Sequence, residues 1–363
     1  MSALRKLPSI SAVLATGAFV TAMASSATVR AFVGRLLGYL GLSAPGGLWR
    51  ALAVLLLLGN WKNLPGVWHL RLFRGLLYQL YLQPSPFPPS SLFQPIITST
   101  RSPILECDYN LHKSNSTYFA DLDISRTHLV TALLRSGIRR LHDKEHRGSE
   151  SDRAPGTEKV HGSFGIALGG VTCQFKKEIK PYQAYEVWTR LLCWDRKWLY
   201  LVSHLVKKGA TRPAGYGLQP WRKGKKKQML TEEEKEGLKG KVFASSIAKY
   251  VVKKGRWTVP PEQVLMNCGL LPAKPKDATR AGDDGEADKV GEANGDTPEE
   301  QLDAVDAAVL PGQEAEEWTW DMVQKEIQRG MKFAEMFAGL DGLHDEFDGG
   351  AEGVLGEFPD LLW

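Results

Sequence analysis

Hydrophobic and polar positions along the chain predict one long helix accompanied by a series of strands. Residues 96–106 have strand character, and four more strand-like runs occur at 163–176, 184–194, 198–207 and 241–252. The break at 195–197 is short enough for a hairpin. Strands grouped around one helix predict an α+β fold with a mainly antiparallel sheet. The helix is predicted at 118–141, where apolar residues recur at a mostly helical spacing, at Leu122, Leu129, Leu133, Leu134 and Ile138.

Polar segments divide the chain into regions. Residues 83–94 are rich in Pro and Ser and predict an extended linker, residues 142–160 predict a polar loop, and residues 208–240 form an insertion rich in Gly and Lys. Residues 272–317 contain no aromatic residue and many Ala, Gly, Asp and Glu, which is typical of a disordered acidic linker. We therefore expect an N-terminal region at 1–82, a folded domain at 95–254 and an amphipathic tail helix at 318–345. The tail helix either docks on its own domain or binds a partner.

The N-terminal region is apolar and has no acidic residue before Glu106, although Arg and Lys are scattered through it. Residues 10–29 form an uncharged stretch of about twenty residues, the length that spans a bilayer. Aromatic residues lie among basic ones after it, which favours the headgroup zone of a membrane, at Trp49, Trp61, Trp68, Tyr78 and Tyr81. This composition predicts N-terminal membrane-associated helices, with membrane lipid and not nucleic acid as a partner.

The charge balance around this stretch predicts an orientation. More basic residues follow residues 10–29 than precede them, so the positive-inside rule places the rest of the chain in the cytosol. We expect attachment to the endoplasmic reticulum membrane. A mitochondrial import signal and a buried helical pair packed on the domain are the alternatives.

The sequence contains no recognisable motif for binding a metal or a cofactor. The spacing of Cys107, Cys173, Cys193 and Cys268 favours free thiols over a zinc site or a disulfide framework. His142 and His146 are spaced as neighbours on a helix, but without a third ligand they predict a polar helix end. There is no phosphate-binding loop, dinucleotide-binding glycine fingerprint or G-x-S-x-G turn. We expect neither a cofactor nor a metal.

Candidate chemistry lies between the first strand and the long helix, in the sequence D-Y-N-L-H-K-S-N-S-T-Y from Asp108 to Tyr118. Backbone N–H groups at a helix start are unpaired and can hold a carbonyl oxygen while a nearby carboxylate acts on its carbon. In the alternative interpretation Asp108 only caps the turn and His112 is a packing residue.

This segment and two later ones together resemble the hotdog-fold thioesterases. More narrowly, the chain resembles the 4-hydroxybenzoyl-CoA thioesterase-like branch and its thioesterase superfamily member six-like subgroup. The resemblance covers about 95–254 without the insertion. Ser114 departs from the family pattern, which usually has Asn there. The residues that carry the resemblance are Asp108, His112, Asn115 and Tyr118, then Arg126 with 173–177 and 179–182, and finally 189–195 with 198–200.

The resemblance implies a fold, a reaction and an assembly. The fold is a hotdog fold, an antiparallel sheet wrapped around one long helix. Asp108 would be the catalytic carboxylate, with His112, Ser114, Asn115 and Tyr118 positioning an acyl-CoA or acyl-carrier thioester and helix N-terminal amides binding the oxyanion. The sites would lie at the interface of a homodimer, and a higher homo-oligomer is the alternative assembly. A catalytically inactive hotdog scaffold that binds a partner is the alternative. The basic run at 222–227 either attracts the phosphates of anionic lipid or CoA, or is a solvated loop.

Overall fold

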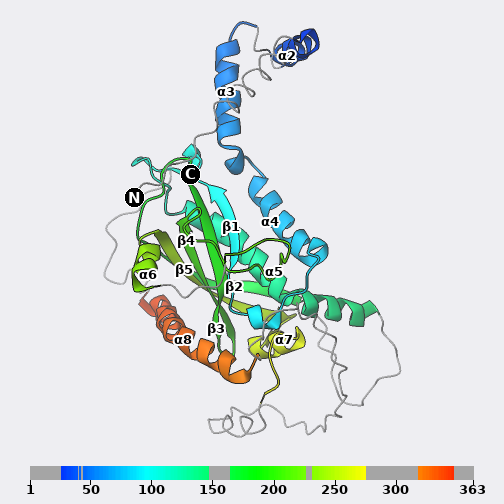
Figure 1. Ribbon diagram of the computed structural model, residues 1–363, viewed down its shortest axis with the longest axis vertical. Helices are drawn as coiled ribbons and strands as arrows, with labels where there is room; N and C mark the ends of the chain where they lie inside the picture. The colour runs from blue at the N-terminus through cyan, green and yellow to red at the C-terminus, as the bar shows by residue number, and fades with distance from the viewer. Residues whose placement is uncertain are drawn as a thin grey trace.

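An antiparallel sheet with a long helix against one face forms the centre of the protein (Figure 1). The computed structural model describes residues 26–39, 41, 44–146, 164–225, 231–274 and 318–346. The strand order is β1-β3-β4-β5-β2, and β6 pairs with β5. The strands are β1 (Ile96–Arg101), β2 (Phe164–Phe175), β3 (Ala184–Trp194), β4 (Trp198–Lys207), β5 (Val242–Lys254) and β6 (Trp257–Val259).

The strand predictions for residues 184–194 and 198–207 are confirmed, as is the hairpin between them. The prediction that the first strand continues to residue 106 is wrong. β1 ends at Arg101, and a 3-10 turn, η4 (Ile104–Glu106), follows Pro103. Proline has no N–H to donate to a strand ladder, and this ends the strand before the motif.

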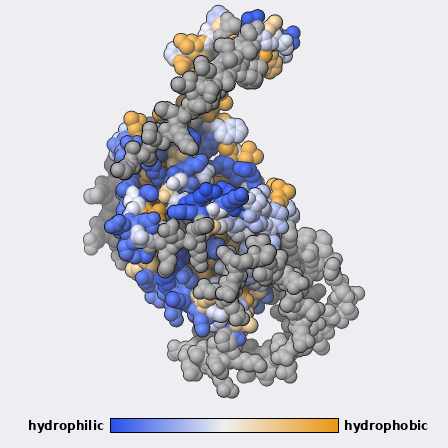
Figure 2. All heavy atoms as spheres, viewed as in Figure 1, coloured by the Kyte–Doolittle hydropathy of each residue, from blue (hydrophilic) through white to orange (hydrophobic). Residues whose placement is uncertain are grey.

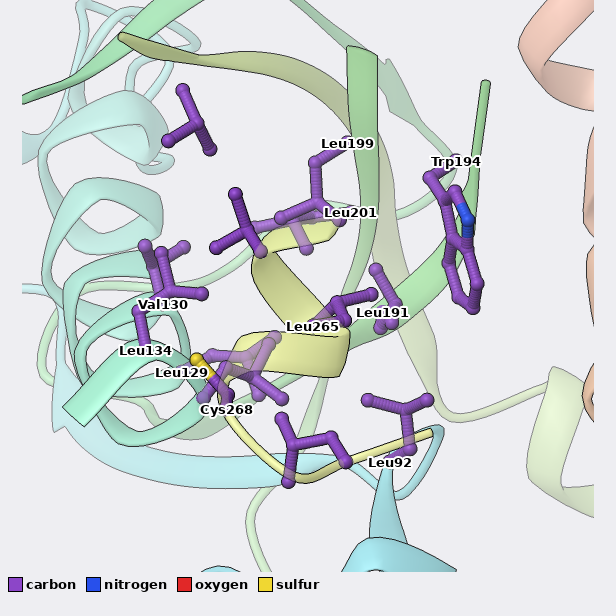
Figure 3. Packing of buried hydrophobic residues seen from close by; sticks show 14 of the residues in the cluster. Leu92, Leu129, Val130, Leu134, Leu191, Trp194, Leu199, Leu201, Leu265 and Cys268 are labelled. Atoms are coloured by element: carbon purple, nitrogen blue, oxygen red, sulfur yellow. The ribbon is translucent and has the colours of Figure 1, made fainter. Parts of the chain in front are cut away.

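The long helix α5 (Thr117–His146) lies across the sheet as the resemblance implied. It is longer than predicted, because the first residues of the expected polar loop continue it to His146. Its buried leucines pack against β3 and β4, and α7 (Pro261–Asn267), which the sequence did not reveal, closes this core (Figure 3). The buried apolar side chains of this core include Leu92, Leu129, Val130, Leu133, Leu134, Leu191, Leu199, Leu201 and Leu265.

The amphipathic tail forms α8 (Trp320–Ala338) and docks on its own domain. α8 covers the sheet face opposite α5, where Ala334 and Phe337 pack with Leu192 and Cys193 of β3. Both faces of the C-terminal half of β3 are therefore buried. This explains why the alternation of polar and apolar residues fades along that strand. The insertion carries one further helix, α6 (Glu232–Lys239), with a capping box between Thr231 and Glu234.

The described part of the N-terminal region, from residue 26 onward, forms a series of short helices. They are α2 (Ala27–Tyr39), α3 (Gly47–Gly59), η1 (Trp61–Asn63), α4 (Val67–Leu77) and the π-helical turn η2 (Tyr78–Leu82). α4 and η2 pack along α5, and Gln79 Nε2 of η2 lies 3.2 Å from His128 Nδ1 of α5. α3 projects away from the sheet (Figure 1).

The structure gives no support to a membrane-spanning helix. None of the helices in the described ranges combines the length and the apolar character needed to cross a bilayer. Residues 10–25 of the predicted spanning stretch lie outside the described residues, as do residues 147–160 of the predicted polar loop and 275–317 of the predicted acidic linker.

Candidate active site

Asp108 lies in a tight loop between η4 and α5. Asp108 N donates to His112 O at 2.8 Å, and Cys107 and Lys113 form a β-bridge that closes the loop. The Asp108 Oδ1 atom accepts backbone N–H bonds from Asn110 at 2.9 Å and from His112 at 3.4 Å. Asp108 therefore caps the turn with one oxygen. The other oxygen, Oδ2, accepts no hydrogen bond from any residue in the described part of the chain, and the side chain is half-buried.

His112 does not face Asp108 with its ring. Its Nε2 lies 2.7 Å from Glu178 Oε2, and both side chains are substantially exposed. Glu178 belongs to the loop after β2, and no pattern in the sequence links it to His112. The structure thus brings the backbone of His112, and not its imidazole, to the carboxylate of Asp108.

Ser114 and Asn115 form the turn that starts α5. Ser114 N donates to Glu106 O at 2.7 Å, and the Thr117 hydroxyl donates to Ser114 O at 2.7 Å. Among the described residues, the hydroxyl of Ser114 forms a hydrogen bond only with that of exposed Ser116, at 3.1 Å. Within the described ranges, the backbone N–H groups of Asn115 and Ser116 have no acceptor. These are two free donors at the positive end of a long helix.

Tyr118 is a buried wall of the site. Its ring meets Phe175 edge-on with centroids 5.0 Å apart, and Lys113 Nζ lies 5.4 Å from its centroid. Burial raises the pKa of the Tyr118 hydroxyl well above its usual value, and the neighbouring Cys173 and Asp108 raise it further. Of the predicted site residues, Asp108 and Tyr118 therefore lie close together, while the side chains of His112 and Asn115 are on the surface.

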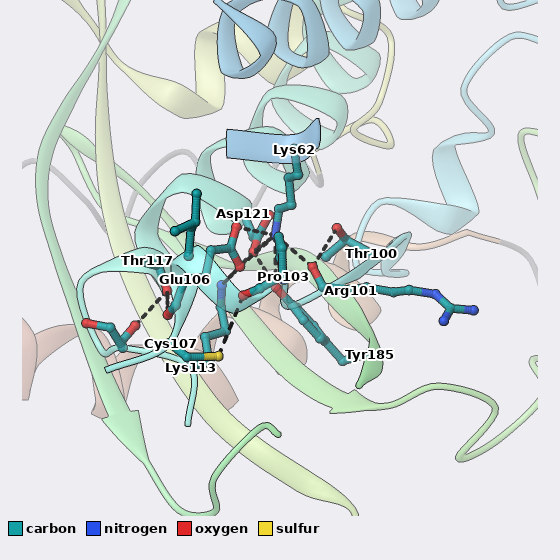
Figure 4. A network of polar contacts seen from close by, with 12 residues as sticks. Lys62, Thr100, Arg101, Pro103, Glu106, Cys107, Lys113, Thr117, Asp121 and Tyr185 are labelled. Atoms are coloured by element: carbon teal, nitrogen blue, oxygen red, sulfur yellow. Dashed lines mark hydrogen bonds and ion pairs between the residues drawn. The ribbon is translucent and has the colours of Figure 1, made fainter. Parts of the chain in front are cut away.

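A buried cluster of charged side chains lies next to the loop that contains Asp108 (Figure 4). Lys62 Nζ is 2.8 Å from Glu106 Oε1 and 2.8 Å from Asp121 Oδ2. Lys113 Nζ joins the same two carboxylates, at 2.5 Å and 3.2 Å, and its side chain is fully buried. Tyr185 of β3 also donates its hydroxyl to Asp121. Glu106 and Lys113 flank the Asp108 loop, so the cluster fixes both ends of it.

The charges of this cluster depend on one another. Burial alone would raise the pKa of the Asp121 carboxyl, but Lys62, Lys113 and Arg71 hold it well below its usual range. Burial lowers the pKa of Lys62, and Asp121 and Glu106 oppose that shift. Arg71 Nη2, from α4, lies 2.8 Å from Asp121 Oδ1. The sequence did not predict this cluster, because no periodicity links Lys62 to residues of α5.

Thiols and metal ligands show no organised site. Cys107, Cys173 and Cys193 are free thiols. In the described part of the chain, no three His, Cys, Asp or Glu side chains come together as metal ligands would. The Asp108 carboxylate and the free N–H groups at the start of α5 suit chemistry on a carbonyl group.

The chain matches known thioesterases over most of its length. The model of the thioesterase-like superfamily matches residues 102–220, which include the Asp108 loop and α5. The chain is 37% identical to "Probable thioesterase atnL" of Emericella nidulans, covering 84% of this chain and 90% of that protein. It is 36% identical to "Thioesterase poxG" of Penicillium oxalicum, covering 85% and 90%.

Among solved structures, the hypothetical protein TT1821 of Thermus thermophilus is 15% identical, with a TM-score of 0.29, covering 48% of this chain and 97% of that one. That TM-score is too low to support a conclusion about fold or function. The two sequence relatives are similar enough, over enough of their length, to establish the family that the residue motifs indicated. The chain belongs to the thioesterase-like superfamily.

Proposed function

We propose that this protein hydrolyses acyl thioesters at the start of α5, with Asp108 as the catalytic carboxylate. The observation that carries the proposal is the different hydrogen bonding of the two Asp108 carboxylate oxygens. Oδ1 is held by two backbone N–H groups, which orient the side chain, while Oδ2 accepts nothing from the described residues. A half-buried carboxylate with one oxygen fixed and one available suits a general base or a nucleophile.

The thioester carbonyl would lie between Asp108 and the first turn of α5. Asp108 takes a proton from water, and the water oxygen bonds to the carbonyl carbon. The free N–H groups of Asn115 and Ser116 stabilise the negative charge on the carbonyl oxygen, assisted by the dipole of α5. The carbon–sulfur bond then breaks, and the leaving thiolate takes the proton that Asp108 had accepted from water. The Tyr118 ring packs beside the site, and His112 and Ser114 position the turn through their backbones.

Hydrolysis assays on the purified full chain test this proposal. The panel contains acyl-CoA and acyl-carrier-protein thioesters of several chain lengths. We expect Asp108→Asn to lower the rate at least about a hundredfold, since general-base catalysis contributes that much, while the fold is kept. Asp321→Asn, the same change in the first turn of α8, serves as the matched control and keeps the full rate. Equal rates in Asp108→Asn and the wild type would refute the role of Asp108.

Direct attack by Asp108 on the carbonyl carbon is the second chemical route. It can be separated from the water route by a single turnover in ¹⁸O-labelled water. Direct attack by water labels the released acid and never Asp108, so label in the Asp108 carboxylate would show that an acyl-enzyme anhydride formed and was hydrolysed at the Asp108 carboxyl carbon. A wild-type chain that hydrolyses no thioester on the panel would instead favour the inactive scaffold.

We infer that the active assembly is a homodimer formed through β2. β1 and β2 end the strand order of the sheet in the described part of the chain, and the 12 residues of β2 contain no charge and no proline. An edge strand without such protection presents unpaired N–H and C=O groups to a second copy. Light scattering should give twice the chain mass of 40.2 kDa, and Ala167→Lys should shift it to one chain. A monomeric wild type would exclude this interface.

We propose that the N-terminal helices attach the protein to a membrane surface. α3 exposes a run of large apolar side chains, including Leu48, Trp49, Leu55 and Leu58, with exposed fractions of 64–74%. In the view of Figure 2, several hydrophobic residues are visible on this projecting part among hydrophilic ones, and much of the visible face of the sheet domain is hydrophilic. Helices of this kind lie in the headgroup zone without crossing the bilayer.

Vesicle flotation tests this attachment. The full chain should float with anionic phospholipid vesicles, and Leu55→Lys with Leu58→Lys should abolish flotation. Lysine substitutions at exposed Phe333 and Met336 on α8 are the control and should leave it intact. A fluorescent fusion then distinguishes the cytosolic side of the endoplasmic reticulum, which we propose, from a mitochondrial location.

A further inference from the structure

The outer face of the sheet carries a cavity that the hydrolysis site does not use. Its volume is about 850 Å³, and it lies between β1, β3 and the insertion. Tyr185 and Val187 of β3 are fully buried on the α5 side, so Glu186 and Trp188, which line the cavity, point to the opposite face. The sheet therefore separates this cavity from α5.

The lining of the cavity has a strong excess of positive charge. Five cationic side chains and two carboxylates line it. In the described part of the chain, neither carboxylate forms an ion pair with one of these cations. Glu186 accepts from Trp188 Nε1 at 3.0 Å and from Gly209 N at 3.2 Å, while Glu234 caps α6. No salt bridge within the described ranges involves any of the five cations, which are Arg212, Arg222, Lys223, Lys225 and Lys241.

The insertion is folded around these cations by hydrogen bonds to its own backbone. Arg212 Nη2 donates to Lys223 O at 2.8 Å, and Lys241 Nζ donates to Ala210 O at 3.1 Å. Each of these bonds uses one donor of its side chain. An Arg carries five N–H donors and a Lys three, so most remain available for a ligand. These hydrogen bonds hold the cationic side chains in place before a ligand binds, which lowers the entropic cost of binding.

An aromatic surface accompanies the charge. The Arg222 guanidinium carbon lies 4.4 Å from the Tyr216 ring centroid, and Trp188, Ile97 and Leu238 add apolar area to the lining. The volume falls within the range of small-molecule sites, which is about 300–1,000 Å³. Charge, aromatic surface and size together define the chemical class of ligand.

We propose that this cavity binds a nucleotide-type ligand, in which two or more phosphate groups are joined to an aromatic base. The cations of the insertion bind the phosphates, since Arg and Lys form charge-assisted hydrogen bonds with phosphate oxygens. The base packs against the aromatic and apolar lining. This proposal does not rest on thioester hydrolysis, because binding is measured without turnover and in Asp108→Asn as well as in the wild type.

Calorimetric titration of the full chain with ADP, pyrophosphate and adenosine tests the proposal. ADP should bind more tightly than either part alone. The double variant Arg222→Ala, Lys241→Ala should weaken ADP at least about tenfold, since it removes two charged donors. Tyr216→Leu should weaken ADP but spare pyrophosphate, because it removes a ring and no charge.

The matched control also removes two positive charges, but from positions of the insertion that lie outside the cavity lining. Lys235 and Lys239 lie on α6, outside the cavity lining, each paired with a Glu at 2.6 and 2.8 Å. Lys235→Ala with Lys239→Ala should leave ADP affinity unchanged. The proposal is overturned if ADP does not bind at millimolar concentration, or if both double variants weaken it equally. Equal affinity for pyrophosphate and ADP in wild type and Tyr216→Leu would overturn the assignment of the base.

Discussion

Lys62 Nζ lies 2.8 Å from Asp121 Oδ2, so a residue of the N-terminal helical region is bonded to the second turn of α5. Lys62 also donates to Arg101 O at 3.1 Å and to Glu106 at 3.0 Å. Its ammonium group thus joins the end of β1, the turn before Asp108 and α5. Through Lys62 of η1 and Arg71 of α4, the N-terminal region is therefore part of the fold around the candidate active site.

Asp121→Asn should destabilise the protein strongly. The substitution leaves Lys62, Lys113 and Arg71 buried or half-buried around a neutral amide. Breaking a buried ion pair from one side costs about 3–5 kcal/mol. Urea unfolding at pH 7 measures the free energy of unfolding. Glu232→Gln, which breaks only the exposed pair with Lys235, is the control and should cost less than about 1 kcal/mol. Similar costs for both variants would contradict the importance of the cluster.

The stabilisation from Asp121 should depend on pH in one direction. The folded pKa of Asp121 is lowered, so its ionised form stabilises the fold at every pH above the unfolded value, about 3.9. The stabilisation is lost as pH falls from there through the folded pKa. The difference in unfolding free energy between wild type and Asp121→Asn should be constant from pH 7 to about 5 and should shrink below about pH 4. A difference that is the same at pH 3 and pH 7 would refute this linkage.

The sequence predicted the parts of this fold that local patterns encode. β3 and β4 have the predicted bounds because strand-forming residues continue to a short polar break at 195–197. The sequence did not predict α7, which has only 7 residues and too few turns to show a helical period. The Asp108 loop was recognised from its motif. The pairing of Lys62 with Asp121 was not, because contacts between residues 59 positions apart leave no periodic signal.

Ser114 should act through its backbone, and two substitutions separate backbone from side chain. Ser114→Ala removes a hydroxyl that contacts only Ser116, so hydrolysis should stay within about threefold of wild type, as for most surface changes. Ser114→Pro removes the N–H that donates to Glu106 O at 2.7 Å, and should lower both the melting temperature and the hydrolysis rate. Loss of hydrolysis in Ser114→Ala would show that the hydroxyl itself contacts the substrate.

Gly330→Ala should release α8 from the sheet, although Ala is the better helix former. A Cβ atom at Gly330 would lie 2.6 Å from Leu192 O and 3.0 Å from Cys193 Cβ, and a backbone carbonyl of β3 cannot move away without disturbing the sheet. Overpacking of this kind costs about 1–3 kcal/mol, more than the helix propensity gained. Trypsin, which cleaves after Lys325 and Arg329, should cut α8 faster in this variant. Gly339→Ala is the control, because nothing lies within 4 Å of its Cβ position and its φ of −58° suits Ala. Equal cleavage rates in both variants and the wild type would mean that the Gly330 contact does not hold α8 on the sheet.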